Sequence, residues 1–347
     1  MATMRDADRN DMSLGIQNSQ SATEMSGAVP AASLAHEIAS ADLILVTAVT
    51  RVSDTSEPVA LVSPEARPDD DLLRVAEMTV VRTLTGEHHG GPLRVFFLVG
   101  KVPSRPWMAL TEGQTVLLFL RSADDSYAPV EPWGIPIQTL PGIAPPPAGV
   151  SRTRAVVHEL EQVILTADPI SSASLIVRAT IARVGLRGDV DLDLLSTPVL
   201  QDPTRRAAWV AIVLAEGKVE ALDEVPSLFA NRAPPPADTL WDLIVQKVSE
   251  LRVAEAHSQL VALLQTERIE LARAAAVALR QLRDPAVVLD LIGALDHQDL
   301  EVRYQALMAL AELEPSVGAG PSFELYRQNE SYYIHQWKQW HERRDKL

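Results

Sequence analysis

Apolar residues follow two different periods along the chain, and the change falls near residue 150. Between residues 34 and 140, short runs rich in β-branched residues alternate with turn residues, which is the pattern of a small all-β domain. A helix at 33–40 is predicted to come before them. The runs lie at 42–52, 73–84, 93–99, 115–120 and 127–130. Five short strands in a segment of this length predict a small closed β-barrel.

Proline marks the loops and boundaries of this pattern. The loop between the first two predicted strands, residues 53–71, is acidic and contains three prolines, which predicts an excursion that projects from the surface. Residues 145–147 are three successive prolines, which fix φ and withhold backbone donors, so they predict a linker after the barrel. A second proline triple at 234–236 predicts a stiff loop among helices.

From residue 151 onward the apolar positions follow helical spacing. Amphipathic helices are predicted at 154–165, 174–184, 204–214 and 239–251, with no fixed period before residue 230. Residues 251–281 then align with residues 282–312 at a spacing of 31. The identities are Leu251 and Leu282, Arg252 and Arg283, Leu260 and Leu291, Leu264 and Leu295, Glu270 and Glu301, Ala275 and Ala306, Ala278 and Ala309, and Leu279 and Leu310. This period predicts two copies of one structural unit, in which small alanines let neighbouring helices pack closely.

Capping residues mark where helices of the repeated unit begin. Asp284 precedes Pro285, and proline is favoured at the first position of a helix. Asp299 precedes a predicted helix that carries Val302. These segments resemble HEAT repeats, in which paired helices stack into a solenoid. The resemblance covers two units and implies a third one upstream, whose second helix is 239–251.

The β region resembles the OB-fold barrel of the netrin and metalloprotease-inhibitor (TIMP-like) class, which occurs in exported bacterial proteins. The resemblance rests on residues 41–46, 80–86 and 112–121. Inhibitors of that class place an N-terminal cysteine on the zinc ion of the enzyme, and this chain has no cysteine. The resemblance therefore implies a barrel and does not imply protease inhibition.

Together these patterns predict a multidomain α and β protein, with a five-stranded OB-like β-barrel followed by an α-solenoid of HEAT-type helix pairs. The N-terminal residues are polar, and such a composition cannot bury enough apolar surface to fold. The predicted segments are a disordered tail at 1–32, the barrel at 33–140, a proline-rich linker at 141–150, irregular helices at 151–250, HEAT repeats at 251–320 and an aromatic capping helix at 321–347.

The chain is acidic, with a formal net charge of −15, and both of its halves carry more acids than bases. Nucleic acids and anionic membranes attract basic stripes, so neither is expected as a partner. A protein or peptide partner with a basic face suits this charge. No apolar run reaches the length of a membrane span. The first 30 residues lack the apolar core of a signal peptide. A location in the bacterial envelope is therefore suggested only by the resemblance of the domains, and the cytoplasm is the alternative.

Catalytic and metal-binding patterns are not evident in the sequence. Without cysteine the chain cannot form disulfides, zinc–thiolate sites or thiol nucleophiles. The His-Glu pairs at 36–37 and 158–159 begin like a zinc-protease motif, but neither has the second histidine that this motif requires. The two histidines at 88–89 have no third ligand nearby, so a plain hairpin loop is the preferred interpretation. We therefore expect no catalytic residue, no metal and no cofactor.

Two groups of residues are candidates for partner binding. Tyr333, Trp337 and Trp340 share one face of a predicted helix, because they lie at positions i, i+4 and i+7. Such aromatic residues dominate interface hot spots, but a repeat stack also needs a cap at its open end, and the cap is the favoured interpretation. Arg273 and Arg303 lie on second helices of the repeats. There the HEAT resemblance implies that arginines brace the next helix, and bracing is favoured over ligand binding.

The leading hypothesis for function is a non-enzymatic interaction or scaffold protein that offers its solenoid surface to a partner of unknown identity. The alternative is an accessory or lyase-like enzyme, because some bacterial HEAT-like repeats resemble bilin-lyase and hydroxylase families. Those families keep chromophore-holding or iron-binding residues, whereas His257 and His297 here do not fall at equivalent positions of the repeat. A third possibility is a purely structural role, with the barrel closing the N-terminal edge of the solenoid.

Overall fold

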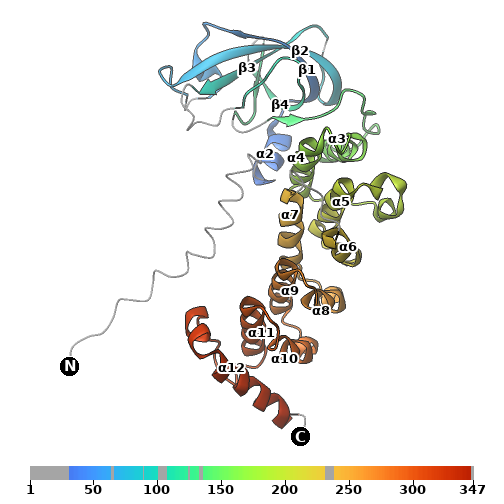
Figure 1. Ribbon diagram of the computed structural model, residues 1–347. Helices are drawn as coiled ribbons and strands as arrows, with labels where there is room; N and C mark the ends of the chain where they lie inside the picture. The colour runs from blue at the N-terminus through green and yellow to red at the C-terminus, as the bar shows by residue number, and fades with distance from the viewer. Residues whose placement is uncertain are drawn as a thin grey trace, which may run out of the picture. The chain divides into compact units, whose positions relative to one another are not determined.

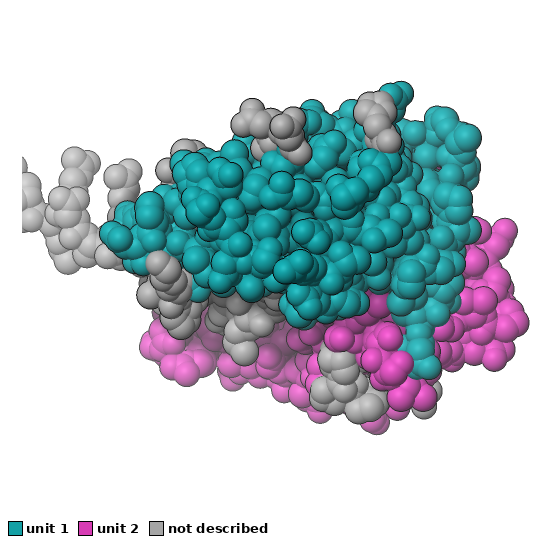
Figure 2. All heavy atoms as spheres, turned by 90° about the horizontal axis from the view of Figure 1, so that it is seen from above, with its two compact units in different colours: residues 1–168, 178–188 teal, residues 169–177, 189–347 magenta. Residues whose placement is uncertain are grey.

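The computed structural model describes residues 31–63, 66–88, 90–100, 108–123, 126–132, 136–230 and 238–344. These residues belong to two compact units, which Figure 2 colours separately. The first unit comprises residues 1–168 and 178–188, and the second comprises residues 169–177 and 189–347. Residues 1–30 of the predicted tail lie outside the described residues, and the last two residues of that segment begin helix α2 (Ala31–Ser40). The proline triple at 234–236 also lies outside them.

The first unit contains the predicted β-barrel, of which strands β1 to β4 are labelled in Figure 1. The ring closes in the order β1–β2–β3–β5–β4–β1, and every pair is antiparallel except β3 with β5. A short strand, β6, adds to β4. The prediction of a five-stranded OB-like barrel is confirmed, because this closed strand order, with its one parallel pair, is the Greek-key arrangement of an OB-type barrel. The strands are β1 (Leu43–Asp54), β2 (Asp71–Thr85), β3 (Leu93–Gly100), β4 (Thr115–Ala123), β5 (Ser126–Pro129) and β6 (Ile137–Gln138).

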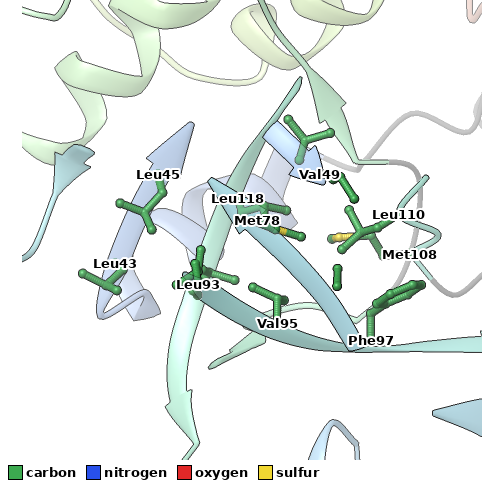
Figure 3. Close-up of a cluster of buried hydrophobic side chains, with 13 residues drawn as sticks. Leu43, Leu45, Val49, Met78, Leu93, Val95, Phe97, Met108, Leu110 and Leu118 are labelled. Atoms are coloured by element: carbon green, nitrogen blue, oxygen red, sulfur yellow. The ribbon is translucent and has the colours of Figure 1, made fainter. Parts of the chain in front are cut away.

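The interior of the barrel is filled by apolar side chains from the inward faces of its strands (Figure 3). Leu45, Val95 and Leu118 come from three different strands and are all buried. The turn after β2 requires a glycine. Gly86 has a φ of +86°, and a Cβ at this position would lie 2.5 Å from the carbonyl oxygen of Asp42. This close approach fixes the end of β2 where the sequence predicts it.

The described part of the loop between β1 and β2 packs against the barrel, so the prediction of a projecting loop is wrong. The loop contains a short 3-10 turn, η1 (Val59–Leu61), followed by Val62, which is 1% exposed. Val62 joins an apolar cluster with Leu98, and its carbonyl oxygen accepts a hydrogen bond of 2.6 Å from Arg121. Burial of the apolar residues inside the loop favours this packing, whereas the prolines and acids of the loop indicate exposure.

Helix α3 (Arg152–Thr166) belongs to the first unit and packs on β2. Its Glu159 is fully buried and accepts a 2.9 Å hydrogen bond from Arg82 Nε of β2. The hydroxyl of Thr139 donates to the same carboxylate. Arg82 also donates to the carbonyl oxygens of residues 140 and 141, at 2.8 and 3.0 Å. The start of the predicted linker is therefore tied to the barrel by one arginine.

The second unit is helical. The helices predicted at 204–214 and 239–251 are present as α5 and α7, with ends that differ by no more than two residues from the prediction. Helix α4 (Ala173–Val184) contributes residues to both units. The other elements are η2 (Leu192–Ser196), η3 (Pro198–Gln201), α5 (Pro203–Ala215), η4 (Val219–Glu224), α6 (Val225–Ala230), α7 (Asp238–Ser249), η5 (Ala254–Ala256), α8 (His257–Leu264), α9 (Ile269–Leu282), η6 (Pro285–Val287), α10 (Val288–Ala294), α11 (Leu300–Leu313) and α12 (Phe323–Arg344).

Two helix pairs form the repeat stack that the period of 31 residues predicts. Helix α8 packs with α9 and α10 packs with α11, while α7, α9 and α11 pack against one another in succession (Figure 1). The matching alanines Ala275 and Ala306 are fully buried, which lets these second helices approach closely. Both predicted caps are present: Asp284 and Asp299 each accept a hydrogen bond from a backbone N–H two or three residues later.

Helix α12 packs against α10 and α11 at the C-terminal end of the stack. It is kinked at Asn329, where φ is −130°. Helix α12 has 22 residues but is polar. No helix among the described residues is both long and apolar enough to cross a membrane.

Candidate interaction surface

An ion pair between Arg273 and Asp299 connects the two repeats of the stack. Arg273 of α9 donates to both carboxylate oxygens of Asp299, at 2.9 and 2.7 Å. Asp299 is the residue that caps α11, so the same carboxylate both caps this helix and binds Arg273 of the neighbouring repeat. The hydrogen bond from Arg273 lowers the pKa of Asp299 below its ordinary value, and the same bond raises the pKa of Arg273. About half of the Arg273 side chain (51%) nevertheless stays exposed.

Arg303 connects the second repeat to the terminal helix. Its guanidinium pairs with Glu330 of α12 and donates to the carbonyl oxygen of His297 at 2.6 Å. The hydrogen bond with Glu330 raises the pKa of Arg303. The hydroxyl of Tyr326 also lies 3.2 Å from Glu330. Arg273 and Arg303 thus both brace the next element, as the sequence analysis favours, and a role of either in partner binding stays a prediction.

Further ion pairs continue this ladder along the stack. Each lies near the surface, where a single pair contributes about 0–1 kcal/mol, so their combined effect is to hold one spacing between helices rather than to supply most of the stability. The ion pairs are Arg280 with Glu312 at 2.7 Å and Lys338 with Asp296 at 2.7 Å, and His257 forms a hydrogen bond of 3.0 Å with Asp290.

The predicted aromatic cluster on α12 divides into two parts. Trp337 is 3% exposed and makes an edge contact of 5.4 Å with Trp340, which is only partly buried. Tyr333 instead contacts Tyr326, at 6.3 Å between ring centroids. Tyr326 is fully buried, and this burial raises the pKa of its hydroxyl.

Tyr304 of α11 extends the second part of this cluster onto the stack. Its ring lies 5.4 Å from that of Tyr326 and 5.0 Å from that of Phe323. Sequence reasoning missed Tyr304 and Tyr326, although both carry the contact between α11 and α12. The arrangement fits a cap, because the aromatic side chains face the end of the stack.

A polar cavity of about 640 Å³ lies on α9, α11 and the segment after α7. It brings together Arg252 and Arg283, which the repeat alignment pairs at a spacing of 31 but which the sequence analysis did not assign to any site. The remaining lining residues are Val277, Arg280, Gln281, Gln305 and Glu312. Three arginines therefore line one cavity in a strongly acidic protein.

The first unit has a more apolar cavity of about 350 Å³ beside the β1–β2 loop, lined in part by Val59, Ala60 and Leu73. It contains no charged cluster comparable to that on the second unit. The histidines singled out in the sequence do not converge with it: His88 lies 3.3 Å from the carbonyl oxygen of Gly91, and residue 89 is outside the described residues. Across the described ranges, no group of three or more histidine or acidic side chains is arranged to hold a metal ion.

The sequence of the stack matches a known family. A family model described as HEAT repeats matches residues 255–324, which run from η5 through both helix pairs to the first turn of α12. This segment is similar to HEAT repeats. The HEAT resemblance of the C-terminal region is thereby confirmed for the two helix pairs. A search of curated proteins found no match for the chain.

Proposed function

We propose that the protein is a non-enzymatic interaction or scaffold protein that binds a protein partner on the surface of its HEAT-type stack. The observation that carries this proposal is the stack itself, in which the segment similar to HEAT repeats forms helix pairs joined by a ladder of ion pairs. Repeats of this kind contact only their neighbours and create extended binding surfaces, and HEAT repeats commonly mediate protein interactions.

The five residues predicted to bind a partner also have tasks inside the stack. Because Trp337 is buried and Arg303 is engaged by Glu330, we propose that these two act in the protein's own architecture. Arg273 keeps half of its side chain exposed, so its outer edge remains accessible to a partner. Tyr333 and Trp340 are partly exposed, so both retain surface that a partner can contact.

The net charge of −15 is expected to speed the approach of a partner with a basic face. We also propose that the barrel is of the netrin and TIMP-like type of OB-fold. The strand order supports an OB-type barrel, which that proposal requires.

Site-specific photo-crosslinking tests the proposed function. A photoreactive amino acid is placed at Glu270 or Gln281, which are exposed on α9, and at Leu289, which is 66% exposed on α10. The variants are expressed in cells that naturally produce the protein, and crosslinked products are identified by mass spectrometry. We expect one protein to crosslink from the α9 positions and not from Leu289, because the second helices form the binding face. Absence of any protein crosslink from all three positions would contradict the proposal.

The enzyme alternative predicts a bound group. The purified protein is examined for visible absorbance and for metal content, and we expect neither pigment nor iron at a stoichiometric level. A stoichiometric pigment or ion would favour the lyase-like or hydroxylase-like alternative and overturn the non-enzymatic proposal.

A further inference from the structure

The 640 Å³ cavity is lined by three arginines and by one carboxylate, that of Glu312. Arg280 donates to Glu312 at 2.7 Å and to the amide oxygen of Gln305 at 3.0 Å. Arg283 reaches Glu312 only at 3.5 Å, which is longer than a charge-assisted hydrogen bond. Arg252 donates to the neutral amide of Gln281 at 3.1 Å and meets no carboxylate among the described residues. The cavity therefore carries an excess of positive charge in a protein whose total charge is −15.

Helix dipoles explain part of this arrangement but not all of it. Arg252 follows the C-terminal end of α7, and Arg283 is the C-terminal cap of α9, where cations interact favourably with helix carbonyl groups. A dipole requires no cavity, however, and does not explain why both guanidiniums line the same one as Arg280.

The backbone of Arg283 is also unusual for its residue type. Among the described residues it is the one non-glycine residue with positive φ, at 50°. Glycine or asparagine is the usual residue at such a left-handed helix cap. Unfavourable backbone conformations of this kind are concentrated at ligand-binding positions. The Arg283 side chain is 72% exposed, so its guanidinium is accessible.

We infer that this cavity, called the arginine pocket, binds an extended acidic segment of the protein partner through Arg252 and Arg283. This inference rests on the proposed function, because it names what the stack binds. A guanidinium offers a planar fork of donors that matches a carboxylate, so two arginines suit two acidic side chains. The positive charge of the pocket favours acidic residues, whereas the negative net charge of the whole chain favours a partner with a basic face.

The repeat geometry also sets the spacing of the acidic residues. Arg252 and Arg283 follow the ends of the neighbouring second helices α7 and α9 at equivalent positions of the repeat, and packed helices lie about 8–10 Å apart. A chain in the polyproline II conformation advances about 3.1 Å per residue and completes a turn in three residues, so side chains at i and i+3 lie on one face about 9 Å apart. The segment that fits has two acidic residues at positions i and i+3.

Fluorescence anisotropy with labelled peptides tests the arginine pocket. The probe is an eight-residue peptide of glycine, serine and proline with glutamates at positions i and i+3, titrated with the full chain at low salt. The comparison peptides have both glutamates replaced by glutamine, or placed next to each other. We expect the i, i+3 peptide to bind about tenfold more tightly than either, because each unmade hydrogen bond to a charged group weakens binding by that order.

Protein variants assign the binding to the pocket. R252A/R283A is expected to bind the i, i+3 peptide at least about tenfold more weakly than the wild type. R268A/R327A removes the same charge at exposed arginines that do not line the pocket, and is expected to stay within about twofold of the wild type. R252K/R283K preserves the charge without the planar fork, so it gives an intermediate affinity and remains informative if the alanine variant does not fold.

Several results would overturn the inference. These are equal binding of all three peptides, equal loss in the two alanine variants, or no binding to the wild type. Inorganic phosphate that displaces the peptide with millimolar or better affinity would make the pocket a small-anion site instead. Self-association that depends on Arg252 and Arg283, measured by sedimentation, would make a second copy of this chain the occupant. If a partner crosslinks to α9 but R252A/R283A leaves peptide binding unchanged, the pocket fails while the proposed function stands.

Discussion

The barrel and the helical stack bury their cores by opposite routes. In the barrel, strands that lie far apart in the chain must meet before the ring closes, as when Leu43 pairs with Leu120 across β1 and β4. In the stack, each helix packs on elements of its own repeat or of the neighbouring repeat. Damage in a closed ring therefore affects the whole ring, whereas damage in a stack affects the neighbouring repeats first.

The two regions also differ in how they place charge. The first unit buries an ion pair, with side-chain exposures of 8% for Arg82 and 0% for Glu159. The stack keeps its pairs near the surface, and Arg273 remains 51% exposed although Asp299 binds it. A buried pair is costly to break because one charge is left without a partner, while a surface pair is solvated when broken.

The largest expected effect comes from Glu159→Ala. The substitution leaves Arg82 without its carboxylate beside the barrel, and we expect the free energy of unfolding of the first unit to fall by about 3–5 kcal/mol. Hydrogen exchange of the β1 and β4 amides, together with urea unfolding followed by circular dichroism, measures the change. Glu159→Gln keeps the shape and is expected to lose less. A loss below about 1 kcal/mol for the alanine variant would show that water replaces the carboxylate and that the pair is not a buried one.

Trp337→Ala is expected to destabilise the end of the stack by about 3 kcal/mol, because it removes a large buried aromatic side chain. The comparison of the two regions predicts that faster hydrogen exchange is confined to α12 and to the helices it packs on, α10 and α11. The control is Trp340→Ala, which removes a partly exposed ring and its contact with Arg344, and should cost about 1 kcal/mol. An unchanged melting temperature for Trp337→Ala would support the partner-anchor interpretation over the cap.

Asp299→Ala is expected to lower the stability of the stack by about 1–2 kcal/mol, because it removes the cap of α11 together with the partner of Arg273. Asparagine can still cap the helix, so Asp299→Asn should cost less than about 1 kcal/mol. Urea unfolding of both variants separates the cap from the ion pair. Equal losses for the two variants would assign the effect to the charge alone.

The smallest effect is a dependence on pH. The pKa of Asp299 is lowered in the folded state, so the contribution of its charge is fully present above the ordinary pKa of 3.8 and is lost as the pH falls below it. The stability difference between the wild type and Asp299→Asn, measured by urea unfolding from pH 7 to pH 3, is expected to shrink at the acid end. A difference that is constant over this range would exclude the ion pair as its origin.

The sequence predicts those parts of the fold in which a local pattern repeats. Alternating β-branched runs give the barrel strands, and the period of 31 residues gives both helix pairs, with Asp284 and Asp299 in their capping positions. The closer TIMP-like resemblance and the proposed domain boundaries stay predictions. No short-range pattern distinguishes Glu159 from the many solvated acids of this chain, because its burial depends on Arg82, which lies far from it in sequence.

The sequence did not predict the arginine pocket for a different reason. The identity of Arg252 and Arg283 is visible in the repeat alignment, but a repeated arginine is equally consistent with a surface helix end. Only the packing of α7, α9 and α11 places both residues on one cavity with Arg280. Tyr326 was missed for a related reason, since it becomes part of the cluster through its contact with Tyr304 on a separate helix.

Helix α12 has a consequence for association between molecules as well as for the fold of one molecule. The last repeat of any stack has a face shaped to receive another repeat, and a second molecule can supply it. Contacts of this head-to-tail kind form rings where the rotation between molecules closes and filaments where it does not. Tyr326 and Trp337 of α12 are buried at that face, so we expect a variant without α12 to associate with other molecules through it.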